Sequence, residues 1–527
     1  MVTRGVIAAG LVAAGLAACA APGAVSPSGG LSTVASESPA LAGGGAVGCA
    51  ALVSAAPTGV VISLAEPTAA TWTPPLQEGR GSGDVARSVC RVIGQIDGDI
   101  RFEVWLPLDG WNGRFLGTGV GGNAGYLNYA DMARGAEQGF AAASTDTGHG
   151  FSDVTWVADP RKSENYAHRA EHRLAEVSKA IVAGFYGQPA HHSYFIGCSG
   201  GGRQAAKELQ DYPEDYDGII AGAPGYDLAG LSARHLLASL HAVRDPAAAV
   251  DGPIWERIGA AAVTACDDAD GVRDGVIADP KSCRFDVATL SCEQGSGDGC
   301  LTAPQMTAIR AIMAPVKVNG RNIDDGLWAG VTPRPGPPPG LAKAIFGLLV
   351  HKDPAWDPLT FDPDRDIPAA WAGMPRMNAD RTDVRAFAAR GGKAIFYHGL
   401  ADPSTMPQQT IAWVEAAQRD SGAGAGDFLR LYMAPGMLHC SGGAGADKFG
   451  GAGDRQTAYE PGSNLLAALV DWVEEGRTPA AITASHVEDG RTTFTRPLCA
   501  WPQAAAYDGH GDPSLVASFT CRVPTSG

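Results

Sequence analysis

The stretch Tyr194-Phe195-Ile196-Gly197-Cys198-Ser199-Gly200-Gly201 decides the fold of this chain. It joins a short apolar run to a pentad of the form G-x-S-x-G, and residues 203–210 after it have the composition of a helix. Between a strand and a helix, such a pentad forms a sharp turn in which glycines relieve crowding and the serine hydroxyl is held out for attack. The pattern therefore predicts an α/β fold with Ser199 as a catalytic nucleophile.

Alternating strand and helix signals surround this turn. Strands are expected over residues 100–107, 114–116, 139–145, 217–221, 393–397 and 428–433, and helices over residues 164–186 and 463–475. This rhythm is typical of a mostly parallel sheet covered by helices.

The rhythm stops near Pro224 and returns at Lys393. The intervening residues 226–390 carry four cysteines, a proline-rich stretch and an Asp-rich loop, so we interpret them as an irregular, inserted lid domain. The main domain is then expected in two parts, over residues 42–225 and 391–527.

Length and charge limit the functions open to the chain. At 527 residues it is too long for one ordinary core. Its formal net charge is −16 and its Lys and Arg residues are scattered, so the basic patch expected of a nucleic-acid binder is missing. Nucleic acid is not expected as a partner, and the sequence leaves the oligomeric state open.

The N-terminus has the pattern of an export signal. Arg4 precedes an apolar stretch, and Leu16-Ala17-Ala18-Cys19 resembles a bacterial lipobox. On that resemblance residues 1–19 are a lipoprotein signal peptide, Cys19 is lipidated, and residues 20–41 form a flexible tether. An ordinary secretory signal is the alternative. The apolar stretch is too short to span a bilayer, so membrane contact is expected only through the lipid anchor.

Either signal delivers the chain to an oxidising compartment, where cysteines pair. Besides Cys19 there are ten cysteines, an even number that allows five disulfides. They are Cys49, Cys90, Cys198, Cys266, Cys283, Cys292, Cys300, Cys440, Cys499 and Cys521. The absence of a C-x-x-C pair argues against a zinc ribbon or a thioredoxin-type site.

A nucleophilic serine needs a base, and the base needs an orienting carboxylate. Asp402 follows the strand expected over residues 393–397, and His439 follows the strand expected over residues 428–433. Loops after parallel strands meet at one edge of a sheet, so we expect Ser199, Asp402 and His439 to lie together. Their order along the chain is that of α/β-hydrolases.

Two other residues compete for these roles. His398 could be the base, but its place directly after a strand and before glycine favours a buried turn histidine. Asp146 could be the acid, but it precedes the serine in the chain, so a hydrogen-bonded loop carboxylate is favoured.

Cys198 and Cys440 adjoin the proposed nucleophile and base. A disulfide between them would tie the two catalytic loops together, where small misplacements of reacting groups are costly.

These residues resemble the tannase and feruloyl esterase family. The resemblance rests on Cys-Ser at 198 and 199, Asp402, His-Cys at 439 and 440, Gly-Gly-Arg-Gln after the elbow, and Tyr-Pro-Glu-Asp-Tyr-Asp-Gly-Ile-Ile-Ala-Gly-Ala-Pro from Tyr212. It runs from about Cys49 to Cys521 and implies an α/β-hydrolase fold with a large inserted lid domain. The implied disulfides are Cys49–Cys90, Cys198–Cys440, Cys266–Cys283, Cys292–Cys300 and Cys499–Cys521.

The Asp-rich loop at residues 266–276 suggests a metal. Carboxylates at short intervals, with glycines that permit a tight turn, suit a hard cation such as calcium. The resemblance implies a structural Ca²⁺ in the lid, held by the side chains of Asp267, Asp270 and Asp274 and the carbonyl groups of Val272 and Val276. A solvated acidic turn is the alternative.

The expected activity is a carboxylic ester hydrolase. Ser199 would attack the ester carbonyl and form an acyl-enzyme while His439 takes the proton. The N–H of Gly200 should stabilise the oxyanion, and the resemblance places the second donor at Gly122. The chain departs from its relatives at Gly200, where Thr or Glu is usual, and at Val120, where glycine is common.

The resemblance implies small esters of aromatic acids, feruloyl or galloyl, as substrates. The lid offers Trp328, Phe346, Leu349, Trp356 and Trp371 for recognition, although most of these are expected in the core. Hydrolysis of mono(2-hydroxyethyl) terephthalate is an alternative, but no arginine for its carboxylate can be identified. The sequence also leaves open a peptidase on the same fold and a non-catalytic ligand-binding surface lipoprotein.

Overall fold

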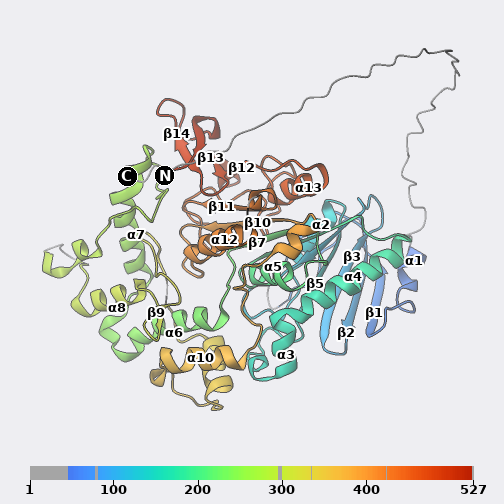
Figure 1. Cartoon of the computed structure of the whole chain (residues 1–527), viewed down its shortest axis with the longest axis horizontal. Coiled ribbons are helices and arrows are strands. Elements are labelled where there is room, and N and C mark those ends of the chain that lie inside the picture. Colours follow the sequence, from blue (N-terminus) through green and yellow to red (C-terminus); the bar gives the residue numbers. More distant parts are fainter. Residues whose placement is uncertain (1–45, 78–80, 295–298, 334, 423, 525–527) are drawn as a thin grey trace, which may run out of the picture. The chain divides into compact units, whose positions relative to one another are not determined.

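The structure is a computed structural model and describes residues 46–77, 81–294, 299–333, 335–422 and 424–524 (Figure 1). The predicted signal peptide over residues 1–19, with Cys19, and the predicted tether over residues 20–41 lie outside the described residues.

A nine-stranded sheet organises the described part of the chain, in the order β1-β2-β3-β5-β4-β6-β7-β10-β11. Its strands are β1 (Val60–Pro67), β2 (Val89–Ile96), β3 (Ile100–Pro107), β4 (Arg114–Thr118), β5 (Ala141–Thr145), β6 (His192–Cys198), β7 (Gly218–Gly222), β10 (Lys393–Gly399) and β11 (Leu429–Ala434). Antiparallel pairing joins β1 to β2, β2 to β3 and β3 to β5, whereas every pair from β5 to β11 is parallel. This mixed sheet with helices around it is an α/β-hydrolase fold.

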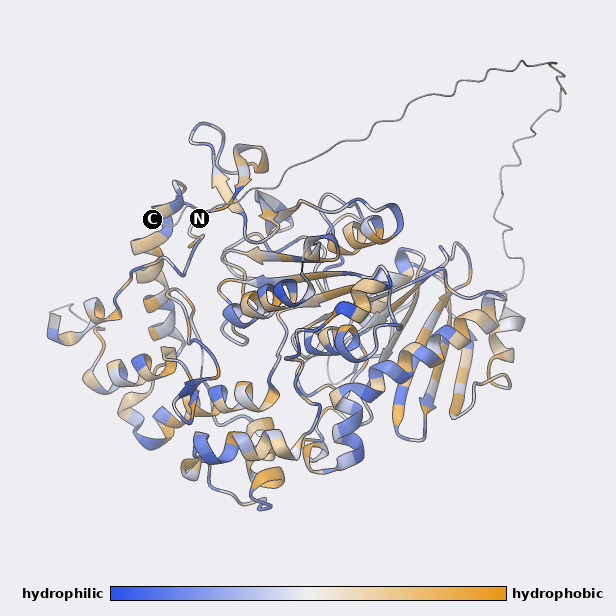
Figure 2. Cartoon of the chain, viewed as in Figure 1, coloured by the Kyte–Doolittle hydropathy of each residue, from blue (hydrophilic) through white to orange (hydrophobic). Residues whose placement is uncertain are grey.

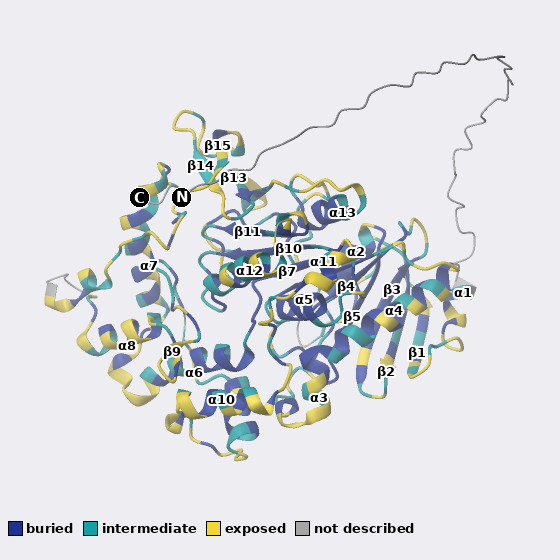
Figure 3. Cartoon of the chain, viewed as in Figure 1, coloured by how far each residue is buried: buried dark blue, intermediate teal, exposed yellow. Residues whose placement is uncertain are grey.

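The alternation of side chains along the strands builds a core on each face of the sheet. In β6, Phe195 packs in one cluster, whereas its neighbours Tyr194 and Ile196 pack in the other. The first cluster includes residues of α4 (Ala170–Tyr186), α5 (Gly200–Asp211) and α12 (Pro407–Ser421), and the second includes α13 (Leu465–Glu475). Figure 2 shows the strands mostly in hydrophobic colours, and Figure 3 shows the central strands and α5 mostly buried, whereas β1 is largely exposed or intermediate.

The lid prediction was wrong in one respect, because residues 226–390 are largely helical rather than irregular. They contain α6 (Leu228–Arg244), α7 (Gly252–Cys266), α8 (Ala303–Met313) and α10 (Pro363–Gly373). Each begins at a side chain that accepts a hydrogen bond from its first turn: Asp227, Asp251, Thr302 and Asp362. The sequence interpretation followed the strand-helix rhythm and overlooked these capping residues.

Part of the lid shares a buried apolar core with the main domain, and we refer to this cluster as the lid core. Phe346 and Trp356 of the lid belong to the same buried cluster as Val120, Trp156 and Tyr166. The chain leaves the sheet after β7 and returns to it at β10. The exact domain boundaries stay a prediction.

The described chain has further α-helices and β-strands outside the nine-stranded sheet and its main helices. They are α1 (Ala46–Ala51), α2 (Tyr129–Glu137), α3 (Pro160–Glu164), α9 (Gly340–Lys343), α11 (Arg385–Ala389), β8 (Lys317–Val318), β9 (Arg321–Asn322), β12 (Ala481–Glu488), β13 (Arg491–Cys499), β14 (Ala504–Tyr507) and β15 (Phe519–Arg522). Across the described ranges, no helix is both long enough and apolar enough to traverse a bilayer.

Candidate active site

Ser199 occupies the turn between β6 and α5 and has a left-handed backbone, with φ of 64°. A residue with a side chain adopts this conformation only where its surroundings hold it there. The N–H of Ser199 donates to the carbonyl of Gly222 at 2.9 Å, and its carbonyl accepts from the N–H of Arg203 at 2.9 Å. At Gly197 an added Cβ would lie 2.4 Å from the carbonyl oxygen of Gly201, so the turn requires glycine there.

His439 and Asp402 lie together on the loops that follow β11 and β10. Nδ1 of His439 lies 2.7 Å from Oδ2 of Asp402. Asp402 is fully buried, while His439 is partly exposed and lines the same cavity as Ser199. The structure thus brings the three residues that the sequence singled out to one edge of the sheet.

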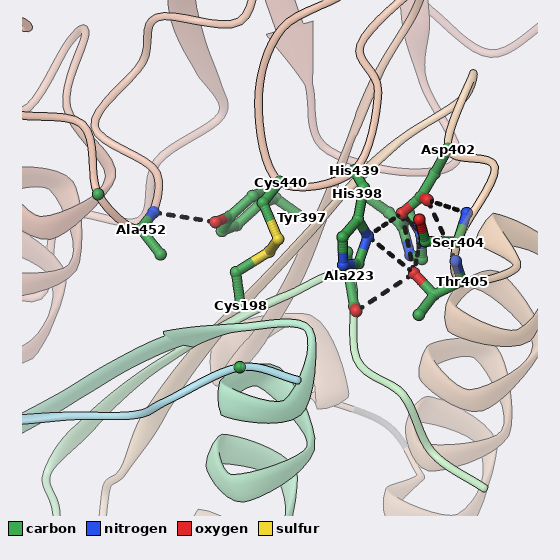
Figure 4. Close-up of a disulfide and its surroundings, with 12 residues drawn as sticks. Cys198, Ala223, Tyr397, His398, Asp402, Ser404, Thr405, His439, Cys440 and Ala452 are labelled. Carbon is green, nitrogen blue, oxygen red and sulfur yellow. Dashed lines mark hydrogen bonds and ion pairs between the residues drawn. A yellow bond between two sulfur atoms is a disulfide. The ribbon is translucent and has the colours of Figure 1, made fainter. Parts of the chain in front are cut away.

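Asp402 is held by a dense set of donors (Figure 4). Its Oδ1 accepts the N–H groups of Ser404 and Thr405, at 2.7 and 3.1 Å, and its Oδ2 accepts the hydroxyl of Thr405 at 2.8 Å. Burial alone would raise the pKa of Asp402, but hydrogen bonds from His398 and His439 outweigh it and hold this pKa well below its ordinary value. Asp402 is therefore a fixed anion that can orient a histidine.

The two residues that competed for the roles of base and acid, His398 and Asp146, have other contacts. His398 is fully buried at the end of β10, with Nε2 at 3.0 Å from Asp402 Oδ2 and Nδ1 at 2.8 Å from Thr410 Oγ1. His398 is therefore not only a buried turn histidine, because it also bonds the carboxylate of Asp402. Asp146 pairs with Arg101, Nε to Oδ2 at 2.7 Å, and accepts the backbone N–H of Arg101 on β3 and that of Gly148 in its own loop.

A disulfide joins Cys198 to Cys440, with a Cα–Cα distance of 6.0 Å (Figure 4). It ties the residue before Ser199 to the residue after His439. The remaining disulfides join the same cysteines as the family resemblance implies: Cys49–Cys90, Cys266–Cys283, Cys292–Cys300 and Cys499–Cys521.

Ser199 lines a cavity of about 290 Å³ that is open to solvent. The lid contributes mainly apolar side chains to its wall, from α6 and from residues 339–342. The lid aromatics expected from the sequence do not form this wall in the described residues. Phe346, Leu349 and Trp356 are buried in the lid core, as expected for most of this group.

Two polar side chains of the wall were missed by the sequence analysis. Ser232 and His235 lie on the cavity face of α6, together with Leu228 and Leu231. This spacing of three and four residues marks one helix face and could have been recognised from the sequence. Nε2 of His235 donates to the carbonyl of Ser404 at 3.0 Å, and burial lowers the pKa of His235 below its ordinary value, so its Nδ1 is left as an acceptor.

The expected oxyanion donors face the same cavity. Gly200 begins α5, and Gly122 lies in the loop after β4 with a φ of +60°. A Cβ built at Gly200 would lie 3.1 Å from the carbonyl oxygen of Val120 and 3.3 Å from the nitrogen of Gly122. The loop therefore packs directly on the start of α5, a close approach that glycine at position 200 allows.

The Asp-rich loop is ordered by its own carboxylates. Oδ1 of Asp267 accepts the N–H groups of residues 274, 275 and 276, at 3.0 to 3.2 Å. Asp270 and Asp274 line a small cavity of about 50 Å³, where Arg496 of β13 binds Asp274. Burial, with the nearby charge of Asp274, raises the pKa of Asp270. Within the described ranges, no three His, Cys, Asp or Glu side chains converge as a metal-binding group.

The chain is similar in sequence and in fold to known proteins. The sequence model of the family described as "Tannase and feruloyl esterase" matches residues 84–332 and 342–522. A probable feruloyl esterase B of Aspergillus clavatus is 32% identical over 465 residues, which cover 84% of this chain and 88% of that protein. An uncharacterized esterase of Xanthomonas campestris pv. campestris is 33% identical over 489 residues, which cover 83% of this chain and 85% of that protein. The crystal structure of feruloyl esterase B from Aspergillus oryzae has a TM-score of 0.84 at 26% identity and covers 90% of this chain and 100% of that one.

Proposed function

The chain belongs to the tannase and feruloyl esterase family of carboxylic ester hydrolases, and we propose that it cleaves esters of aromatic acids of the feruloyl type through Ser199, His439 and Asp402. The contact that carries this proposal is the 2.7 Å hydrogen bond between His439 and a buried, ionised Asp402, beside the same cavity as Ser199. It places a base in the tautomer whose Nε2 can accept a proton.

The reaction proceeds in two steps. Ser199 Oγ attacks the ester carbonyl while His439 takes its proton, and His439 then protonates the departing alcohol to leave an acyl-enzyme. A water activated by His439 next attacks the acyl carbon, and Ser199 regains its proton as the acid leaves. The N–H groups of Gly122 and Gly200 stabilise the negative oxygen in both steps.

The cavity wall supports a hydroxylated aromatic acyl group. Leu228, Leu231 and Leu341 supply apolar contact area, and Ser232 and His235 supply hydrogen-bonding groups for a ring hydroxyl. A terephthalate monoester would need a cation for its free carboxylate. Among the described residues that line the cavity, Arg203 alone is permanently charged, and its guanidinium is bound to backbone carbonyls.

The test is release of free acid from methyl ferulate, methyl gallate and mono(2-hydroxyethyl) terephthalate by protein that lacks residues 1–19. We expect turnover of methyl ferulate, and loss of this turnover in Ser199→Ala. Absence of turnover on all three esters by folded wild-type protein would contradict the proposal.

A matched substrate pair tests the acyl preference. Ser232→Ala should raise KM for methyl ferulate and leave KM for methyl 3-methoxycinnamate, which differs from it only by lacking the ring hydroxyl, unchanged. An equal change for both esters would place Ser232 outside ring recognition.

Export and a lid-bound calcium are further parts of the proposal. Five disulfides are typical of an exported protein, and Cys19 would carry the lipid anchor. Calcium would be held by the carboxylates of Asp267, Asp270 and Asp274 with the carbonyl groups of Val272 and Val276. All these ligands are oxygens, as a hard cation prefers, and a cation would offset the repulsion between Asp270 and Asp274.

A further inference from the structure

The glycine-rich loop after β4 lines the cavity and carries the proposed oxyanion donor, the N–H of Gly122. The N–H of Ala124 donates to the carbonyl of Gly121 at 3.0 Å, which closes a tight turn around Gly122. The N–H of Gly121 lies 3.3 Å from the hydroxyl oxygen of Tyr126. Over the described ranges, by contrast, the N–H of Gly122 has no hydrogen-bond acceptor. An N–H in this state can bind an oxyanion without first breaking a bond.

Two neighbouring side chains of α5 hold this loop. Oε1 of Gln204 accepts the N–H of Val120 at 2.8 Å, which fixes the start of the loop directly. Arg203 acts through an intermediate: its guanidinium donates to the carbonyl of Tyr166 at 2.7 Å, and the Tyr166 hydroxyl donates to the carbonyl of Gly122 at 2.8 Å. Both anchors thus start from the helix whose first N–H belongs to Gly200.

Tyr166 is placed by an unusual backbone. It lies in a π-helical turn, Asn165–Arg169, between α3 and α4, and the expected continuous helix over residues 164–186 is interrupted there. Such turns re-aim side chains and are frequent at functional sites. Arg203 also lies over the Tyr166 ring, 4.7 Å from its centroid, and its guanidinium binds the carbonyl of Ala167 at 2.8 Å.

A buried aromatic stack fixes the other side of the turn around Gly122. The ring of Trp156 stacks on Tyr166, with centroids 4.1 Å apart, and on His149, with centroids 5.3 Å apart. The indole N–H of Trp156 donates to the side-chain carbonyl of Asn123 at 2.6 Å, and Nε2 of His149 donates to the backbone carbonyl of Asn123 at 2.6 Å. Burial lowers the pKa of His149, so the imidazole is neutral at neutral pH.

We propose that Tyr166 is a positioning residue of the oxyanion hole: through Arg203 on one side and Gly122 on the other, it sets the spacing between the N–H groups of Gly122 and Gly200. The inference rests on the proposed esterase function and deepens it. The two donors lie on segments distant in the sequence, so a rigid link between them keeps both aimed at one oxygen atom. Its removal lets the Gly122 turn relax and weakens stabilisation of the transition state, with the substrate ground state unchanged.

The test is Tyr166→Phe, which removes one hydroxyl and keeps the aromatic stack. The matched control is Tyr186→Phe, because the buried Tyr186 hydroxyl also donates to a backbone carbonyl, that of Pro107, at 2.8 Å and away from the cavity. Complete loss of one oxyanion donor costs about 100- to 1,000-fold in kcat. For a displaced donor we expect kcat of Tyr166→Phe to fall about ten-fold, with KM and the melting temperature close to those of the control.

A second readout is the rate at which an organophosphonate labels Ser199, because the tetrahedral adduct needs the same donors. It should fall by the same factor as kcat in Tyr166→Phe and stay unchanged in Tyr186→Phe. Unchanged kcat and labelling in Tyr166→Phe, a change confined to KM, or equal losses in both variants would overturn the proposal. Failure of the wild type to hydrolyse any ester would contradict the proposed function instead, and the labelling rates would still test the link.

Discussion

Asp402 is shared by two histidines, and only one of them reaches the cavity. His439 lines the cavity beside Ser199, whereas His398 is fully buried and also bonds Thr410. The division of roles follows from position: a base must touch solvent and substrate, and a residue at the end of a buried strand cannot. His398 helps to keep the carboxylate ionised in an apolar setting.

Asp402→Asn should lower kcat about 10,000-fold, because the amide no longer holds His439 in the productive tautomer. The control is Asp146→Asn, which changes another buried carboxylate at the carboxyl edge of the sheet, one that pairs with Arg101. Initial rates on methyl ferulate check the difference. A large loss of kcat in Asp146→Asn, with Asp402→Asn active, would reverse the assignment of the acid.

Glu171 of α4 makes stability depend on pH. It is buried, and neither carboxyl oxygen has a hydrogen-bond partner within the described ranges. Burial raises the pKa of Glu171 from 4.5 to about 8, despite the nearby charge of Arg203. The unfolded chain therefore releases this proton above about pH 4.5, whereas the folded protein keeps it until about pH 8.

The free energy of unfolding should therefore fall between these two pH values. Glu171→Gln should melt at the same temperature as the wild type near pH 4.5 and several degrees higher above pH 8. The control is Glu176→Gln, on the same helix but half-exposed. Parallel melting curves for wild type and Glu171→Gln over the whole pH range would exclude this role.

The candidate triad could be predicted from the sequence because each member has a local signal. Ser199 has its glycines, and Asp402 and His439 follow apolar strands. Tyr166 and the role of His398 could not be predicted in this way. Their contacts are made across the fold or within a buried network, and their local sequence carries no motif for them.

At the scale of elements, the strands around the elbow could be predicted from the sequence, whereas the lid helices were not. The strand signals around the elbow correspond to β3, β4, β5, β6, β7, β10 and β11, because these strands are mostly buried and therefore read as apolar runs. The lid helices were not predicted because they are divided among several small apolar clusters: α6 and α10 pack in one, and α7 and α8 pack in others. In addition α6 faces the cavity, so no single apolar stripe stands out.

The disulfide Cys198–Cys440 joins the end of β6 to the loop after β11, and breaking it should affect catalysis more than folding. The variant Cys198→Ser with Cys440→Ser should lose about 100-fold in kcat, because Ser199 and His439 then move independently. Removal of Cys499–Cys521, which joins β13 to β15, should lower the melting temperature and leave kcat unchanged. Equal kcat in the two double variants would show that the first disulfide has no catalytic role.

At the scale of the whole molecule, the Asp-rich loop connects the lid to the β12–β13 pair, through the ion pair between Asp274 and Arg496 of β13. If calcium binds there, a chelator should lower the melting temperature and added Ca²⁺ should restore it. When Ca²⁺ exceeds its Kd 100-fold, binding adds about 2.7 kcal/mol to the free energy of unfolding. Mg²⁺ should not substitute, because it prefers a smaller octahedral site.

Asp270→Asn is the matched variant and should melt alike with and without calcium. A wild-type melting temperature that ignores both chelator and Ca²⁺ would mean that the loop is stabilised by its internal hydrogen bonds and by Arg496 alone.

The covalent tie beside the serine also has a consequence for biosynthesis. Its two cysteines are 242 residues apart, so the ribosome completes the whole lid between making the first and the second. Thiols stay reduced in the cytosol, and the bond closes only in an oxidising compartment. A chain that is exported therefore acquires its finished catalytic geometry after translocation, and the esters of the cell's own metabolism are spared while the enzyme is being made.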